Sequence, residues 1–187
     1  MRTYCPGPIA VLILLALAWD ATAGDDGTVA VLSEAQLGSA WVPKESPLEH
    51  FEVSGRSMMQ YGCVNVGFII ESDGAIEAPA RLLAYRGEVP FKPWDKVPTL
   101  MANVSLKSMS EYAPAPGATP EATYTSLAVP FFHKKLSKSL SDEERSRLAS
   151  ALRRACLIDA LAERLTRADK EAEQLDPLPT LDVLLER

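Results

Sequence analysis

Residues 62–86, GCVNVGFIIESDGAIEAPARLLAYR, decide the fold of this chain. Apolar side chains alternate with other residues on both sides of a short turn, and alternation of period two is typical of β-strands. Asp73-Gly74 supplies the turn, where the glycine can adopt a positive φ. The stretch therefore predicts a β-hairpin. Pro79 has no N–H to donate, so we expect the second strand at an edge of the sheet or at a bulge.

A helix is expected after the hairpin. Apolar residues recur at spacings of three and four over residues 94–106, which predicts a helix with one buried stripe of Trp94, Val97, Leu100, Met101 and Val104. Because Pro98 fits only the first turn, the helix should begin near Lys96 or Val97.

A third strand is expected at residues 121–132, EATYTSLAVPFF, which are rich in β-branched and aromatic side chains. A proline-rich loop over residues 112–120 should precede it. The third strand can lie beside the first, giving the order second–first–third. These elements predict an α+β domain over residues 47–133, built on a small three-stranded antiparallel sheet in the order ββαβ.

Residues 134–187 change character and predict an α-helical extension. Ser141 and Glu144 form a capping box. Leucines at spacings of four and five, from Leu148 to Leu165, predict one long helix or two helices broken near Cys156. The leucine stripe either packs on the domain or serves as a partner surface.

The first residues are typical of a secretory signal peptide. Arg2 precedes an apolar run over residues 9–19, which is shorter than the roughly 20 residues that span a bilayer. Ala21-Thr22-Ala23 then gives a cleavage pattern. We expect a signal peptide at residues 1–23, cut after Ala23, and a leader at residues 24–46. The alternative is an uncleaved N-terminal anchor.

Cleavage would remove Cys5 and leave Cys63 and Cys156, 93 residues apart (156 minus 63). An even pair in an exported protein predicts a disulfide. The alternative is two buried free thiols.

Charge and composition exclude several classes of function. With a net charge of −6, the chain lacks the basic character of proteins that bind nucleic acid or anionic lipid. His50 and His133 have no metal-ligand spacing and are expected at the surface. The sequence shows no glycine-rich phosphate loop and no nucleophile elbow. We therefore expect no metal, no cofactor and no enzyme activity.

The ordered set of motifs resembles the TonB C-terminal domain family. It comprises Gly62 to Ile70 followed by Asp73-Gly74, a helix opening at Trp94-Asp95-Lys96, Tyr112-Ala113-Pro114, and a last strand over residues 123–132. The resemblance implies a ββαβ domain in the periplasm of a Gram-negative cell.

In that family the last strand is an open edge that receives a peptide of an outer-membrane transporter by β-augmentation. The resemblance therefore implies a periplasmic protein partner, with such a transporter as the candidate. The implied backbone contacts are Thr123, Tyr124, Thr125, Ser126, Leu127 and Ala128.

Two departures shape the functional hypothesis. The family's Tyr-Pro pair is replaced by Phe51-Glu52, and no proline-rich arm lies between residues 24 and 50. We therefore expect a binding module without a membrane span after signal cleavage, which does not itself transmit force. The alternatives are an anchored energy transducer and an envelope scaffold that uses the helical extension as its interface. A bond between Cys63 and Cys156 could pin the extension over the free edge of the third strand.

Overall fold

The computed structural model describes residues 29–45, 49–54, 59–91, 96–108, 111–158, 161–162 and 172–186, without the side chains of residues 78–80 and 106–108. The expected signal peptide and its cleavage site lie outside these residues. Within them the protein is a mixed α+β structure. None of the helices in the described ranges is both long and apolar enough to span a bilayer.

The strands are β1 (Ala30–Val31), β2 (Trp41–Pro43), β3 (Phe51–Val53), β4 (Tyr61–Ile70), β5 (Ile76–Gly87), β6 (Tyr112–Pro114), β7 (Thr123–His133) and β8 (Glu173–Gln174). The helices are α1 (Glu34–Leu37), α2 (Val97–Ser108), α3 (Lys134–Ser139), α4 (Asp142–Ala155) and α6 (Leu181–Leu184).

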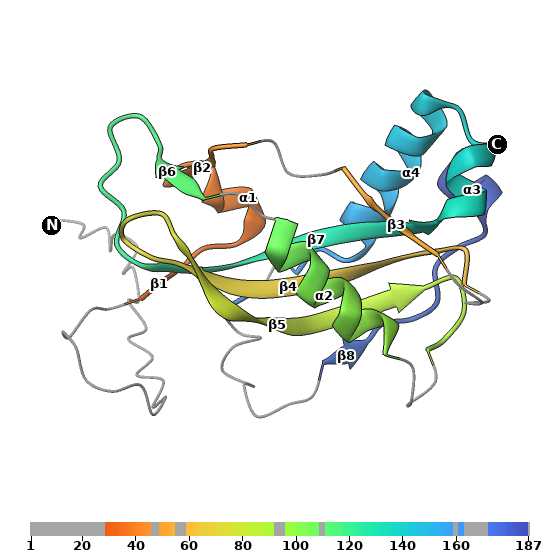
Figure 1. Ribbon diagram of the computed structural model, residues 1–187, viewed down its shortest axis with the longest axis horizontal. Helices are drawn as coiled ribbons and strands as arrows, with labels where there is room; N and C mark the ends of the chain where they lie inside the picture. Colours follow the sequence, from red (N-terminus) through yellow and green to blue (C-terminus); the bar gives the residue numbers. More distant parts are fainter. Residues whose placement is uncertain are drawn as a thin grey trace, which may run out of the picture.

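The central sheet contains the three expected strands in the expected order. β5, β4 and β7 are neighbours, and both pairings are antiparallel. The sheet nevertheless has six strands, because β1 and β3 pair with β7 and β8 pairs with β5, all in parallel (Figure 1). The expectation of a small three-stranded sheet is therefore wrong. The added strands have only two or three residues, too few for an alternation pattern to reveal.

The turn between β4 and β5 is formed as expected. Gly74 has a φ of 89°, and a Cβ there would lie 2.0 Å from the carbonyl oxygen of Tyr112. The Asp73 carboxylate accepts a hydrogen bond from the Ala75 N–H at 2.9 Å. Farther along β5 the register with β4 shifts at the segment that contains Pro79, so the proline lies at an irregularity of the ladder.

The sheet is covered on both faces, which makes three layers. Side chains of adjacent residues in a strand point to opposite faces. Val64 and Val66 of β4 pack against α2, whereas Cys63 packs against α4. Almost every residue of β4 is therefore buried, and Figure 1 shows α2 across the strands of the hairpin and α4 beside β7.

Two local expectations are wrong. α2 begins at Val97 and Met101 is buried, both as expected, but Leu100 is 58% and Val104 38% exposed. The buried stripe runs through Ala102 and Ser105 instead and is thus rotated from the expected one. The expected loop over residues 112–120 begins with β6, which pairs with β2 and helps to bury Trp41.

The helical extension ends its long helix at Ala155, so the break near Cys156 is the arrangement observed. The capping box is formed: Ser141 Oγ accepts from the Glu144 N–H at 3.3 Å, and the Glu144 carboxylate accepts from the Ser141 N–H at 2.9 Å. Cys63 and Cys156 form a disulfide, with Cα atoms 6.1 Å apart. The alternative of two free thiols is therefore wrong.

Candidate partner-binding edge

The outer edge of β7, the side that faces away from β4, is occupied at both of its ends. β1 pairs with Thr123 and Tyr124 at one end, and β3 pairs with residues 131–133 at the other. The covering strands come from the N-terminal part of the chain. The hypothesis that the helical extension covers this edge is therefore wrong, because α4 packs on a face of the sheet instead.

The direction of the main-chain groups along this edge follows from three hydrogen bonds. The Ala122 carbonyl accepts from the Ala30 N–H at 2.9 Å, and the Tyr124 carbonyl accepts from the Leu32 N–H at 3.0 Å. The Ala128 N–H donates to Glu34 Oε2 at 2.9 Å. Because main-chain groups alternate in a strand, the outward set comprises Tyr124, Ser126, Ala128 and Pro130.

The predicted contact residues divide by this alternation. The main chains of Tyr124, Ser126 and Ala128 face the outer edge, whereas those of Thr123, Thr125 and Leu127 face β4. Pro130 has no N–H, and it sits at an outward position where the ladder with β4 loses nothing. The partner-binding role of these residues stays a prediction.

Between β1 and β3, the outer edge at residues 125–130 pairs with no strand of the described ranges. Residues of α1 lie there instead, with the carboxylate of Glu34 on Ala128. Ser126 is 1% and Ala128 0% exposed. The edge is thus covered by side chains and a helix, but it is not completed by a strand.

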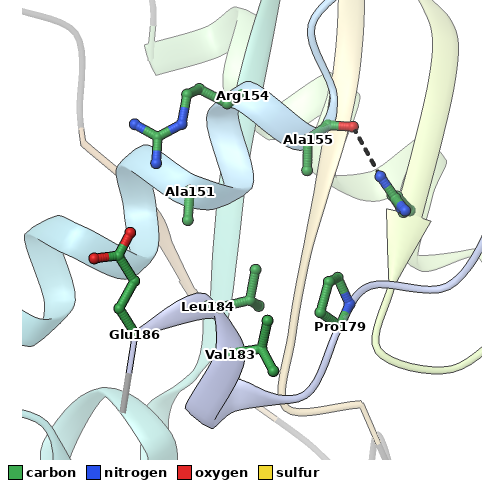
Figure 2. Close-up of a pocket in the computed structure, with 8 residues that line it drawn as sticks. Ala151, Arg154, Ala155, Pro179, Val183, Leu184 and Glu186 are labelled. Atoms are coloured by element: carbon green, nitrogen blue, oxygen red, sulfur yellow. Dashed lines mark hydrogen bonds between the residues drawn. The ribbon is translucent and has the colours of Figure 1, made fainter.

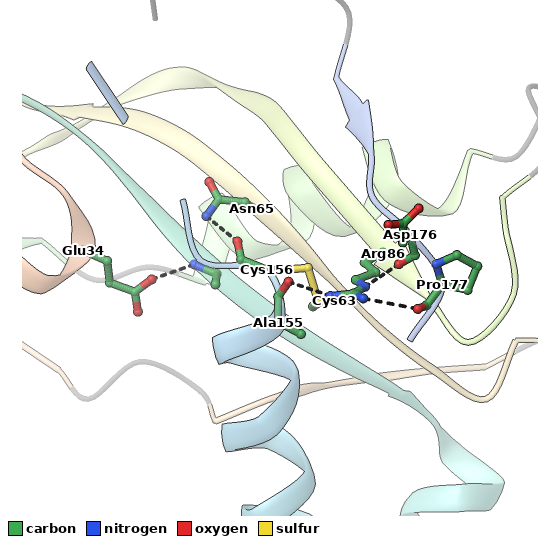
Figure 3. The surroundings of a disulfide bond; sticks show 9 residues. Glu34, Cys63, Asn65, Arg86, Ala155, Cys156, Asp176 and Pro177 are labelled. Carbon is green, nitrogen blue, oxygen red and sulfur yellow. Dashed lines mark hydrogen bonds between the residues drawn. A yellow bond between two sulfur atoms is a disulfide. The ribbon is translucent and has the colours of Figure 1, made fainter. Parts of the chain in front are cut away.

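Burial of the Glu34 carboxylate is electrostatically unfavourable. Its carboxyl group is half-buried, and burial raises its pKa above the usual range. The hydrogen bond from Ala128 and the nearby charge of Arg153 oppose this rise without cancelling it. Figure 3 shows the carboxylate reaching to the main chain of β7.

Tyr124 uses its side chain for packing. A Cβ at Gly67 would lie 2.0 Å from Tyr124 Oη, so only glycine leaves room for the ring on this face of the sheet. Burial raises the pKa of Tyr124, and among the described residues its hydroxyl has no hydrogen-bond partner. The tyrosine ring is therefore packed on a covered face of the sheet, while the main-chain groups of Tyr124 lie at the outer edge of β7.

The same face of the sheet holds the C-terminal extension by a cluster that the sequence did not reveal (Figure 3). Asn65 Nδ2 donates to the Cys156 carbonyl at 2.9 Å, next to the disulfide. Arg86 donates to the carbonyls of Ala155, Asp176 and Pro177. The one available signal was a polar Asn65 inside an apolar strand, which indicates a buried partner.

The two histidines lie in different surroundings. His133 is 6% exposed, and its Nδ1 accepts from the Lys135 N–H at 3.2 Å, which caps α3. His50 stacks on Phe132 with ring centroids 4.3 Å apart, and burial lowers its pKa. The expectation of a surface position is therefore wrong for His133, which is buried, whereas His50 is only half-buried. Across the described ranges, no group of three or more histidine, cysteine, aspartate or glutamate side chains is arranged to hold a metal ion.

A shallow cavity of about 370 Å³ lies between α4 and α6. Figure 2 shows its walls, which combine apolar side chains such as Val183 and Leu184 with the charged Arg154 and Glu186. Arg86 also lines it, but this guanidinium already donates to three carbonyls. The cavity therefore offers mixed walls without a set of convergent free polar groups, and the β7 edge remains the stronger candidate.

No protein-family model, curated protein or solved structure matches this chain.

Proposed function

We propose that this chain is a non-catalytic protein-binding module of the Gram-negative periplasm that resembles the TonB C-terminal domain. In this proposal it takes up an extended partner segment along the outer edge of β7. The observation that carries the proposal is the row of outward main-chain groups at Tyr124, Ser126 and Ala128, beside which a two-residue strand and one carboxylate lie. Such an edge is a template for β-augmentation.

The alternative of an envelope scaffold has less support. That function would use the leucine stripe of the helical extension as its partner surface. Leu148 and Leu152 are fully buried against the sheet together with Cys63. These two leucines of the stripe therefore already have a partner within the chain, which favours the β7 edge as the interaction surface.

Photo-crosslinking in the native compartment tests the proposal. A photoreactive residue replaces Glu121, which is exposed and lies two residues before β7. The matched control replaces Glu143, which is exposed in the first turn of α4. We expect adducts with an extended segment of another envelope protein at position 121 and not at position 143. Adducts with an outer-membrane transporter, on protein that starts at Gly24, would support the TonB-like role in full.

The opposite pattern of adducts would contradict the proposal. Adducts at position 143 without adducts at position 121 would contradict recognition at the β7 edge and would favour the scaffold function.

A further inference from the structure

The N-terminal segment, residues 30–34, begins along β7 as a strand and then leaves it. β1 ends after Val31, and Ser33 becomes the N-cap of α1. The Ser33 N–H donates to Gln36 Oε1 at 3.0 Å, which closes a capping box and turns the chain into the helix. The main chain of the segment therefore turns away before it reaches Ser126 and Ala128.

The register shows what a continuous strand would do at the same place. Val31 lies opposite Tyr124 in a parallel pair, so residue 33 would face Ser126 and residue 35 would face Ala128. In a parallel ladder the Ala128 N–H would then donate to the main-chain carbonyl of residue 34. In the structure it donates to the side-chain carboxylate of that same residue, Glu34. The carboxylate thus stands in for the carbonyl of its own residue.

We propose that residues 30–34 are an internal occupant of the partner edge, which an incoming segment must displace, and that Glu34 mimics the main chain of that segment. This inference rests on the function proposed for the β7 edge. The occupant is lightly attached: Ala30 and Val31 are both exposed and make the only strand pairs of β1 among the described residues.

The burial of Glu34 points in the same direction. The carboxylate loses solvation when the segment is docked, and this desolvation is the largest cause of its raised pKa. Ala128 and Arg153 partly compensate for the loss. An incoming extended segment would offer uncharged carbonyls instead and would return Glu34 to water.

The occupant also sets the apparent affinity of the edge. It is tethered to the same chain, so its effective concentration is high although its contacts are few. A partner can bind only the fraction of molecules whose edge is open, and its apparent affinity falls by that fraction. Loosening residues 30–34 should therefore strengthen partner binding without any change to β7.

Two proline variants of the full chain test this inference. Leu32→Pro deletes the N–H that donates to the Tyr124 carbonyl. Val31→Pro is the matched control, because in this ladder the N–H groups of Ala30 and Leu32 face β7 and that of Val31 faces away. Exchange of the Ala128 amide is measured on the purified proteins, and adduct yield at position 121 is measured in cells.

We expect Leu32→Pro to speed exchange of the Ala128 amide about fivefold or more, the change that loss of one main-chain hydrogen bond gives. Adduct yield should rise by a similar factor, whereas Val31→Pro should match the wild type in both readouts. Unchanged exchange in Leu32→Pro would overturn the inference. Faster exchange with equal adduct yields would overturn the gating but leave the proposed function. Faster exchange without adducts in any variant would overturn the proposed function and the inference with it.

Discussion

The two ends of the chain cover the central strands in different ways. The C-terminal extension is joined by a disulfide, by the hydrogen bonds of Asn65 and Arg86, and by fully buried side chains such as Leu148 and Leu152. The N-terminal segment is joined by a two-residue strand and the Glu34 carboxylate. The first cover is held by covalent and buried contacts, whereas the second, which we propose an incoming segment displaces, has few contacts with β7.

The two segments also cover different parts of the sheet. The extension fixes one face and part of β5, where the N–H groups of Leu175 and Leu178 donate to carbonyls of that strand at 3.0 and 2.8 Å. The N-terminal segment covers the outer edge of β7, where a partner is proposed to bind. A module that must expose one edge gains specificity if every other surface stays closed.

Removal of the disulfide that joins the extension to the sheet should have the largest effect on the free energy of unfolding. We expect the double variant Cys63→Ala/Cys156→Ala to lose about 4 kcal/mol of unfolding free energy, since the disulfide closes a long loop in the unfolded chain. Urea unfolding, followed by the fluorescence of the buried Trp41, measures it. Wild-type protein in reductant is the control. If reduction left the stability unchanged, the extension would not be held as described.

A matched pair of leucines gives the next effect. Leu152 is 0% exposed against the sheet, whereas Leu32 is half-buried in the N-terminal segment. We expect Leu152→Ala to cost about 3 kcal/mol and Leu32→Ala less than about 1 kcal/mol, because the cost follows the buried contacts that are lost. Urea midpoints of the two variants measure the difference. Equal losses would show that the N-terminal segment is as firmly packed as the extension.

The smallest expected effect concerns Glu34 and pH. Because burial raises its pKa, protonation favours the docked state. The stability contribution is thus complete below about pH 4.5 and is lost as the pH rises through the raised pKa. Glu34→Gln does not titrate, so its melting temperature should equal that of the wild type at pH 4 and exceed it by on the order of 2 °C at pH 8.

Exposed Glu121 provides the control, since Glu121→Gln removes the same charge beside β7. A Glu34→Gln variant less stable than the wild type at pH 8 would mean that the contacts with Ala128 and Arg153 outweigh the cost of burial.

The sequence predicted the parts of the fold whose signals are long. The alternation of β4 and β5, the turn at Gly74 and the strand before Phe132 each extend over many residues or require a particular residue type. β1 and β3 left no such signal, because two or three residues cannot show a period. Their pairing with β7 depends on contacts between segments far apart in the chain.

Only part of the candidate edge could be predicted from the sequence. The third strand and its outward residues Tyr124, Ser126 and Ala128 followed from the alternation and the resemblance. Its cover did not, because Glu34 acts through a side chain that reaches a main-chain N–H 94 residues away. The pairing of Cys63 with Cys156 was predictable from the count of cysteines, whereas the Arg86 contacts were not.

Native-state hydrogen exchange of the wild type tests the central claim most directly, with increasing urea and with four amides compared. We expect the amides of Leu32 and Ala128 to exchange together through an opening on the order of 2–3 kcal/mol that urea hardly changes, since little surface is exposed. The amides of Leu175 and Leu178 should exchange only through global unfolding. If all four amides exchanged with the global free energy, the N-terminal segment would be a fixed part of the fold and not a removable occupant.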